Sequence, residues 1–269
     1  MRKLAFLLMV LLAGCTVTEE KYNVDLTLRP YPITAGVETN IDFKITDDSG
    51  NPVPLETMHE RIVHLFTIRE DLEEFKHIHP EDFGKLTEEN MKDAAFSIKN
   101  TFSEAGKYAV VFEFTTNGKT LYKQLELNVE GAKKELSVNR DTGRIKSFSE
   151  YGMEMIPVES LDGQLVEKHG DIKSGEKTNL VFRVIKNGDF VDNLELYLGS
   201  EAHFAVWKDD LTNFMHAHAY MPEMDHGQMY FGPNLPVQLT FPEPGFYKIF
   251  IQFKHEGKVI TGDFMIEVA

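Results

Sequence analysis

Short runs in which apolar and polar residues alternate recur along the chain, with turn residues between them. Residues 37–45 alternate with a period of two and lead into the turn-forming segment 47–52. Residues 110–129 indicate a hairpin, because the tight-turn pair Asn117-Gly118 stands between two alternating runs. Alternation places neighbouring side chains on opposite faces of a strand. The pattern predicts an all-β chain of antiparallel β-sandwich type, immunoglobulin-like or cupredoxin-like.

Helical pieces are expected to be few and short. Residues 72–75 and 211–214 each follow an aspartate that can cap a single helical turn. Residues 87–92 form a third candidate, and no longer helical period interrupts the strands.

The second half of the chain repeats the first at a constant offset of 139 residues. His64 falls on His203 and Tyr108 falls on Tyr247, with no net insertion over the whole span. Each copy has about a hundred residues, the usual size of an independent domain. The predicted division, related by internal duplication, is a leader (1–14), a tether (15–23), a first β-sandwich (24–130), a linker (131–162) and a second β-sandwich (163–269). Within the linker, we assign Met153 and Met155 to packing.

The N-terminus indicates export. Arg2 and Lys3 precede ten apolar residues, which are too few to span a bilayer. The run ends in Leu12-Ala13-Gly14-Cys15, which resembles the lipobox of bacterial lipoproteins. The resemblance implies cleavage before Cys15 and acylation of that residue, palmitate included. The mature protein would then be held by its lipid at the cell envelope, either on the outer face of the cell membrane or in the periplasm at the outer membrane.

Composition narrows the possible chemistry. Cys15 is the one cysteine of the chain, so no disulfide forms, and once it is lipidated no thiolate remains. This excludes Cys-based zinc sites and blue-copper centres of the His2Cys type. The formal charge of −15 becomes −17 when Arg2 and Lys3 leave with the leader. Nucleic acid is not an expected partner, because its binding depends on lysines and arginines that neutralise phosphates.

A histidine pattern occurs once in each copy. At the offset of 139, its members in the two copies are His64, His77 and His79, and His203, His216 and His218. Residues two apart on a strand point the same way, so each His-x-His pair can place two imidazoles together. A third imidazole from a neighbouring strand completes a set that suits Zn(II) or Cu(II). The alternative is structural, with these histidines bonded to backbone carbonyls or to Asp71 and Asp210.

The second repeat adds a segment rich in soft ligands. Its donors without a soft counterpart in the first repeat are Met221, Met224, His226 and Met229. Thioether and imidazole ligands favour copper, and Pro222 and Gly227 mark an exposed loop. The segment therefore predicts a copper site, in which His216 and His218 are rigid donors and His203 is a third. The alternative assigns the methionines to packing.

Two resemblances point the same way. The runs HLFTIREDLEEFKHIHP (64–80), LYLGSEAH (196–203) and FPEPGFY (241–247) resemble uncharacterised exported β-sandwich domains of bacteria, which are described near copper and heavy-metal handling. The run MPEMDHG (221–227) is similar to the Met/His segments of periplasmic copper-resistance proteins. The resemblances imply a place in the cell envelope and other metal-handling envelope proteins as partners.

The sequence therefore predicts an exported, lipid-anchored metal-binding protein that acts as a copper chaperone, sink or sensor. Zinc on the three-histidine set of each repeat is one alternative, and a metal-free adhesion or interaction module of two immunoglobulin-like domains is another. No enzyme is expected, because the sequence has no GxSxG elbow, HExxH motif, phosphate-binding glycine loop or cysteine nucleophile.

Overall fold

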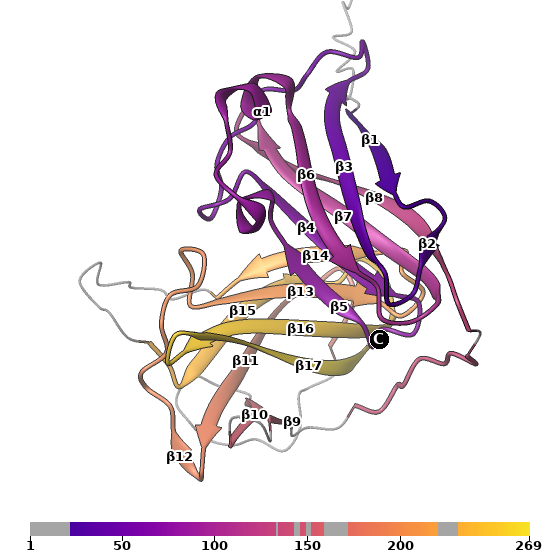
Figure 1. Ribbon diagram of the computed structural model, residues 1–269. Helices are drawn as coiled ribbons and strands as arrows, with labels where there is room; N and C mark the ends of the chain where they lie inside the picture. The colour runs from indigo at the N-terminus through magenta and orange to yellow at the C-terminus, as the bar shows by residue number, and fades with distance from the viewer. Residues whose placement is uncertain (1–21, 133, 143–145, 149–151, 159–171, 220–230) are drawn as a thin grey trace, which may run out of the picture.

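The computed structural model describes residues 22–132, 134–142, 146–148, 152–158, 172–219 and 231–269. Within these residues the chain forms two antiparallel β-sandwiches, which Figure 1 shows one above the other. The predicted fold class, two tandem antiparallel β-sandwiches of immunoglobulin-like or cupredoxin-like type, is confirmed. In the same part of the chain, no helix is both long and apolar enough to cross a membrane.

The first sandwich has two sheets. One sheet has the strand order β1–β3–β6, with bounds Tyr22–Arg29, Glu38–Asp47 and Ala95–Thr101. The other has the order β2–β8–β7–β4–β5, with bounds Ile33–Thr34, Lys119–Glu130, Gly106–Thr116, Val63–Arg69 and Phe75–Ile78. The predicted hairpin is confirmed, because β7 and β8 pair around a turn in which Asn117 has a φ of 51°. Aromatic side chains such as Phe43 and Phe112 fill the space between the sheets.

The second sandwich repeats this plan. One sheet has the order β12–β11–β10–β9, with bounds Asp189–Phe190, Lys177–Lys186, Met153–Val158 and Lys146–Phe148, and β15 (Asn234–Thr240) also pairs with β11. The other has the order β14–β13–β16–β17, with bounds Phe214–His218, Ala202–Lys208, Gly245–His255 and Lys258–Val268. The strands β3, β4, β5, β6, β7 and β8 recur as β11, β13, β14, β15, β16 and β17, each starting 139 residues later.

Strand β10 lies inside the segment 131–162 that the sequence assigned to a linker. It pairs with β11 along its whole length, as β1 pairs with β3 in the first sandwich. Met153 and Met155 are buried in the core of the second sandwich, which confirms their assignment to packing. Strand β9 lies in the same segment and pairs with β10, so the second sandwich takes two of its strands from within it.

One of the three predicted helical pieces is confirmed. Helix α1 (Glu88–Asp93) begins after Thr87, whose side chain accepts a hydrogen bond from the Asn90 backbone. The predicted helical turns at 72–75 and 211–214 are wrong: Leu72 and Leu211 have φ values of 63° and 62°. The preceding aspartates explain the error, because each accepts a hydrogen bond from the backbone two residues on and forms a local turn.

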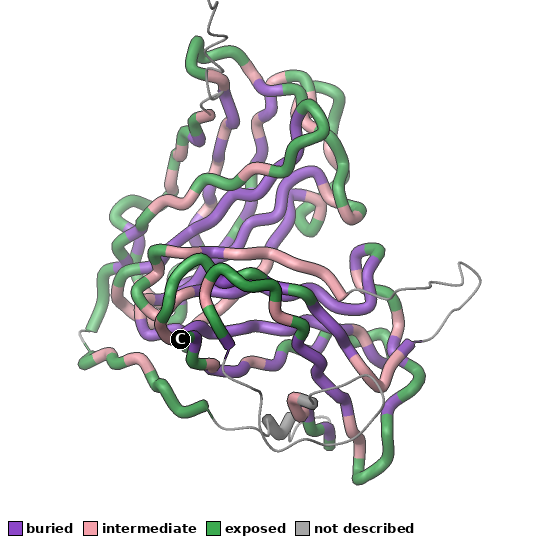
Figure 2. The backbone as a smooth tube through the Cα atoms, turned by 180° about the vertical axis from the view of Figure 1, so that it is seen from behind, coloured by how far each residue is buried: buried purple, intermediate pink, exposed green. Residues whose placement is uncertain are grey.

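A third apolar cluster joins the two sandwiches. In β4, Val63 and Leu65 face the core of the first sandwich, so the alternate residues Phe66 and Ile68 face outward. In β13, Trp207 faces outward in the same way and is fully buried. The outward residues that pack together across the contact are Phe66, Ile68, Leu72, Ala109 and Val111, with Ala205, Trp207, Phe214, Phe250 and Met265. Figure 2 shows buried segments running through both sandwiches and the region where they meet.

Candidate metal centre

Strand alternation carries three histidines of the first repeat to the contact between the sandwiches. His64 lies two residues before Phe66 on β4, so its side chain shares the outward face. His77 on β5 pairs with Phe66, and the two rings stack at a centroid distance of 4.2 Å. His79 follows β5 and caps the 3-10 helix η1 (Pro80–Phe83).

These three imidazoles, called triad 1, present nitrogen atoms to a common point. The Nδ1 atom of His64 lies 3.0 Å from Nε2 of His77 and 3.2 Å from Nε2 of His79. The Nε2 atoms of His77 and His79 are 2.9 Å apart. The structure thus brings together the three histidines that the sequence grouped in the first repeat.

The outward nitrogen of each ring in triad 1 faces a hydrogen-bond acceptor. The three pairs are His64 Nε2 with the Met58 carbonyl oxygen at 3.2 Å, His77 Nδ1 with Gln252 Oε1 at 2.8 Å, and His79 Nδ1 with Asp82 Oδ2 at 3.1 Å. An acceptor at that position requires the proton to sit on the outward nitrogen. In neutral rings the three inward nitrogens then present lone pairs to one another, with no proton between them. A cation at this point would turn that repulsion into ligation.

The corresponding imidazoles His203, His216 and His218 form triad 2. His203 Nδ1 lies 3.3 Å from His216 Nε2, and one nitrogen of each ring lies within 4.8 Å of the others. His203 Nε2 lies 2.8 Å from the Tyr197 carbonyl oxygen, and His216 Nδ1 lies 2.7 Å from Glu113 Oε1. His218 Nε2 is buried and has no hydrogen-bond partner in the described part of the chain. Such an orphaned nitrogen is costly in a folded protein unless a ligand uses its lone pair.

Burial keeps the rings of His64 and His77 in triad 1, and of His203 and His218 in triad 2, in the neutral form that metals bind. Burial and the neighbouring histidines lower the pKa of His64 to about 2 and the pKa of His203 to about 3. The same causes hold the pKa values of His77 and His218 well below the ordinary value of 6.5. Because ligating imidazoles must be deprotonated, these shifts leave the lone pairs of these four rings available over the whole physiological pH range.

The spacing of triad 1 fits a transition-metal ion. Metal–nitrogen bonds of about 2.0–2.1 Å in a tetrahedral site place the nitrogens roughly 3.3 Å apart. The observed separations of 2.9–3.2 Å would need to widen only slightly. Three imidazoles suit zinc or copper and leave one coordination position open. Among the described residues, the two triads are the clusters of three or more potential ligands that converge in this way.

The sequence missed one further histidine. His59 lies in the turn before β4, and its ring stacks on His218 at a centroid distance of 3.6 Å. The corresponding residue 139 positions later is Leu198, which offers no ligand. The first repeat therefore places an additional imidazole beside triad 2. Because His59 has no duplicated counterpart, the repeat pattern gave no signal for it.

Three other polar residues were also missed. Glu113 and Gln252 correspond at the offset of 139, and they pair with His64 and His203 in the strand registers. That position beside a patterned histidine was the signal that could have found them. Glu201 is buried, and neither of its carboxylate oxygens has a partner among the described residues. Burial raises the pKa of Glu201 to about 7.

Five predicted residues lie outside the described part of the chain. These are the proposed soft ligands Met221, Met224, His226 and Met229, together with the lipidation site Cys15. Their roles remain predictions.

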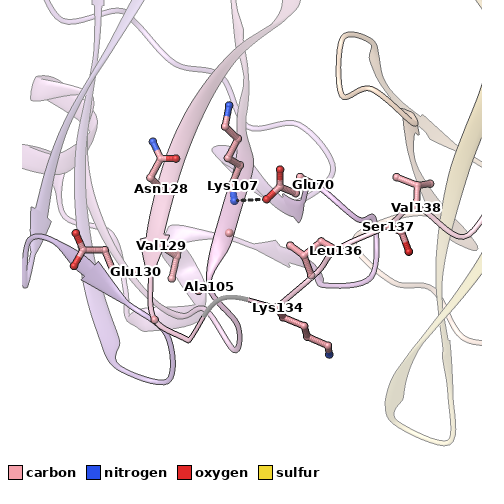
Figure 3. Close-up of a pocket in the computed structure, with 12 residues that line it drawn as sticks. Glu70, Ala105, Lys107, Asn128, Val129, Glu130, Lys134, Leu136, Ser137 and Val138 are labelled. Carbon is pink, nitrogen blue, oxygen red and sulfur yellow. Dashed lines mark hydrogen bonds between the residues drawn. The ribbon is translucent and has the colours of Figure 1, made fainter.

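The cavity drawn in Figure 3 is separate from the histidines. It has a volume of about 790 Å³ and lies between the first sandwich and the segment after β8, with Glu70 and Lys107 on one side and Leu136 on the other. Glu70 and Lys107 stand at the ends of β4 and β7 that are remote from His64 and Glu113. Its lining residues include no histidine, so the cavity is not part of the metal centre.

Comparison with solved structures gives only distant likenesses. The chain is similar to the adhesin FdeC of Escherichia coli, with 11% identity and a TM-score of 0.25, over 91% of this chain and 64% of that one. It is similar to the adhesin InvE of Yersinia pseudotuberculosis, with 13% identity and a TM-score of 0.25, over 91% of this chain and 59% of that one. It is also similar to invasin, a bacterial integrin-binding protein, with 12% identity and a TM-score of 0.23, over 90% of this chain and 39% of that one. The chain thus spans less than two thirds of each, and TM-scores this low support no inference about function.

Family comparison is more informative. None of the curated proteins matches the chain. Residues 16–131 and residues 159–269, however, match the model of a domain of unknown function (DUF8832). The two matches cover most of the chain and fall on the two sandwiches. The chain therefore belongs to the DUF8832 family and carries two copies of its domain in tandem.

Proposed function

We propose that this protein binds transition-metal ions in the two histidine triads, at the contact between its repeats. The metal is copper, with zinc as the alternative, because both accept three neutral imidazoles. The protein would act outside the cytoplasm, held at the cell envelope by the lipid on Cys15. The proposed activity is binding rather than catalysis.

The convergence of three ring nitrogens within 2.9–3.2 Å in triad 1 carries this proposal. A purely structural set would hydrogen-bond its inward nitrogens as well as its outward ones. Here the outward nitrogens already hold acceptors, so a shared inward proton would require one ring to be charged in a buried site. The lowered pKa values of His64 and His77 argue against such a charge on either of these two rings.

The burial of the histidines indicates which role in metal handling the protein has. The side chains of His79 and His216 are only 2% and 1% exposed, so a bound ion would be shielded from competing ligands. Shielded sites release ions slowly, whereas a chaperone must hand its ion over. We therefore propose a metal sink or sensor rather than a chaperone.

The direct test is a competition titration of the full chain with Cu(II) and Zn(II) against a chromophoric chelator. We expect tight binding by the wild type and the loss of one ion in the double variant His77→Ala/His79→Ala. His255→Gln is the matched control, because His255 is buried but bonds to Asn193 away from the triads. Equal binding by wild type and double variant would refute the proposal for triad 1.

The methionine segment requires a separate arm. A Cu(I) chromophore competes with the wild type and with Met221/Met224/Met229→Leu. If the segment closes over copper, the variant loses Cu(I) affinity while Zn(II) binding stays unchanged. Equal Cu(I) binding by both proteins would show that the methionines are not ligands. The proposal would then rest on the two triads only.

The competing function is a metal-free adhesion or interaction module. Two bacterial adhesins stand among the similar structures, but their TM-scores of 0.25 are too low to support this alternative. An interaction module predicts no metal-dependent change in melting temperature. A ligand that binds only the folded state must raise it.

The anchor is tested by fractionation. Cys15→Ser should move the protein from the membrane fraction to the soluble exported fraction, with no effect on metal binding by the purified chain. An unchanged distribution between the fractions would exclude lipidation at this residue.

A further inference from the structure

The two triads lie so close together that their rings form one cluster. Within the triads, ring centroids are 4.4–5.5 Å apart. Across the contact, the His64 ring lies 5.3 Å from the His216 ring, and the His77 ring lies 5.8 Å from His216 and 6.0 Å from His203. Distances between the triads are thus nearly the same as distances inside them.

Each repeat also supplies a hydrogen-bond acceptor to the other repeat's triad. Glu113 of the first repeat accepts from His216 Nδ1 at 2.7 Å, and Gln252 of the second accepts from His77 Nδ1 at 2.8 Å. The Gln252 amide is held in this orientation because its Nε2 donates to Thr261 Oγ1. These acceptors fix which ring nitrogen is free to ligate. Neither triad is therefore complete within one repeat.

We propose that the two triads form one dinuclear metal centre shared by the repeats. Each repeat supplies three ligands for one ion and one orienting residue for the other ion. Loading the centre ties the two sandwiches together at the end of the contact where β4 and β13 begin. This inference rests on the proposed function, and it adds that the two ions are neighbours whose binding depends on the docked repeats.

The surrounding charges suit two cations close together. Two neighbouring dications repel each other, and nearby carboxylates offset that repulsion. Glu113 and Asp82 bond directly to ligand rings of triad 2 and triad 1. The open coordination position of each three-histidine site can take water, hydroxide or one small anion that bridges both ions.

The ion pair is tested by electron paramagnetic resonance of the full chain during titration with Cu(II). One equivalent should give the signal of an isolated Cu(II). The second should give a broadened signal with reduced integrated intensity and a half-field transition, because the two spins are close. Two bound ions with full, unbroadened intensity would overturn the shared centre but leave metal binding intact. No bound copper or zinc at all would instead overturn the proposed function.

The crossed acceptors are tested in backgrounds that retain one triad. Where only triad 2 remains, through His77→Ala/His79→Ala, Glu113→Ala should weaken metal binding about 10–100-fold, as is usual for residues that orient ligands. Where only triad 1 remains, through His216→Ala/His218→Ala, Gln252→Ala should do the same.

The matched control is Gln124→Ala, because Gln124 donates across the contact to the Leu211 carbonyl oxygen without touching a histidine. It should leave both affinities unchanged. Metal-free melting curves check that each variant folds. If Glu113→Ala and Gln252→Ala bind metal as the control does, the crossed dependence is refuted. Each variant is also made in the other background, where it should leave the triad of its own repeat unchanged; weakening of that triad alone would refute the assignment as well.

Discussion

The two repeats share their ligands but differ in the side chains around them. In both, a strand histidine bonds to the carbonyl oxygen of the preceding turn, at Met58 and at Tyr197. The acceptors that cross the contact differ, because a carboxylate at Glu113 corresponds to an amide at Gln252. The additional ring of His59 corresponds to Leu198. The histidine geometry is the same in both copies, while the acceptor that crosses the contact to triad 2 is a carboxylate and triad 2 has one more imidazole beside it.

The largest expected effect is metal-induced stabilisation of the wild type. An ion at a thousandfold excess over its Kd adds about 4 kcal/mol to the free energy of unfolding, so two ions add roughly twice that. His77→Ala/His79→Ala and His216→Ala/His218→Ala should each lose about half of this gain. Denaturant unfolding with and without Zn(II) measures it, with His255→Gln as control. An equal gain in all four proteins would show that the triads do not bind the ion.

The next largest effect concerns the apolar cluster that docks the repeats. Trp207 is fully buried and lies 6.2 Å from Phe66 and 4.5 Å from Phe214, centroid to centroid. Trp207→Ala should cost about 3–5 kcal/mol, and the change at its counterpart, Ile68→Ala, should cost about 2–5 kcal/mol. Denaturant unfolding of the metal-free chain measures both. A loss below about 1 kcal/mol for both would mean that the repeats are not docked in solution.

Acidification should destabilise the metal-free protein. The folded pKa values of His64 and His203, about 2 and about 3, lie below the unfolded value of 6.5. Between these pKa values the unfolded chain binds more protons than the folded chain. The free energy of unfolding is therefore highest above pH 6.5 and decreases as the pH falls. Each such histidine contributes a slope of about 1.4 kcal/mol per pH unit. His64→Gln and His203→Gln should each flatten the curve of unfolding free energy against pH; unchanged slopes would contradict the burial argument.

The smallest effect separates the repeats most finely. His59→Leu installs the residue found at the corresponding position 198 and removes the ring stacked on His218. Loss of an aromatic contact of about 1 kcal/mol corresponds to roughly fivefold weaker binding. Titration in the two single-triad backgrounds should show this change for triad 2 alone. Equal weakening of triad 1 would mean that His59 acts on the whole contact.

Much of the fold could be predicted from local sequence patterns, but the metal centre could be predicted only in part. The constant offset of 139 predicted the two sandwiches, and the spacing of His77 and His79 predicted a pair of rings on one face. The joining of the two triads could not be predicted, because it depends on how two separate domains dock. A signal was present in the outward positions of β4 and β13, where Phe66 and Trp207 stand in place of polar residues. Apolar residues on both faces of these strands indicate a second buried surface, but they do not say which surface covers it.

The sequence patterns did not predict strand β10 or the two short turns, for different reasons. Strand β10 begins eight residues earlier than the offset predicts from β1, so the repeat comparison placed it in the linker. Asp71 was assigned as a helix cap from its type alone. In the structure its carboxylate is bound by the Arg69 guanidinium, a partner two residues away that local helix rules do not weigh.

The central claim is that the triads hold metal ions. Native mass spectrometry of the full chain, loaded with Zn(II) or Cu(II) and then exchanged into metal-free buffer, tests it most directly. The account predicts two retained ions for the wild type, one for each single-triad variant and none for the variant that lacks His77, His79, His216 and His218. A wild type that retains no ion, or a four-histidine variant that still retains two, would contradict it.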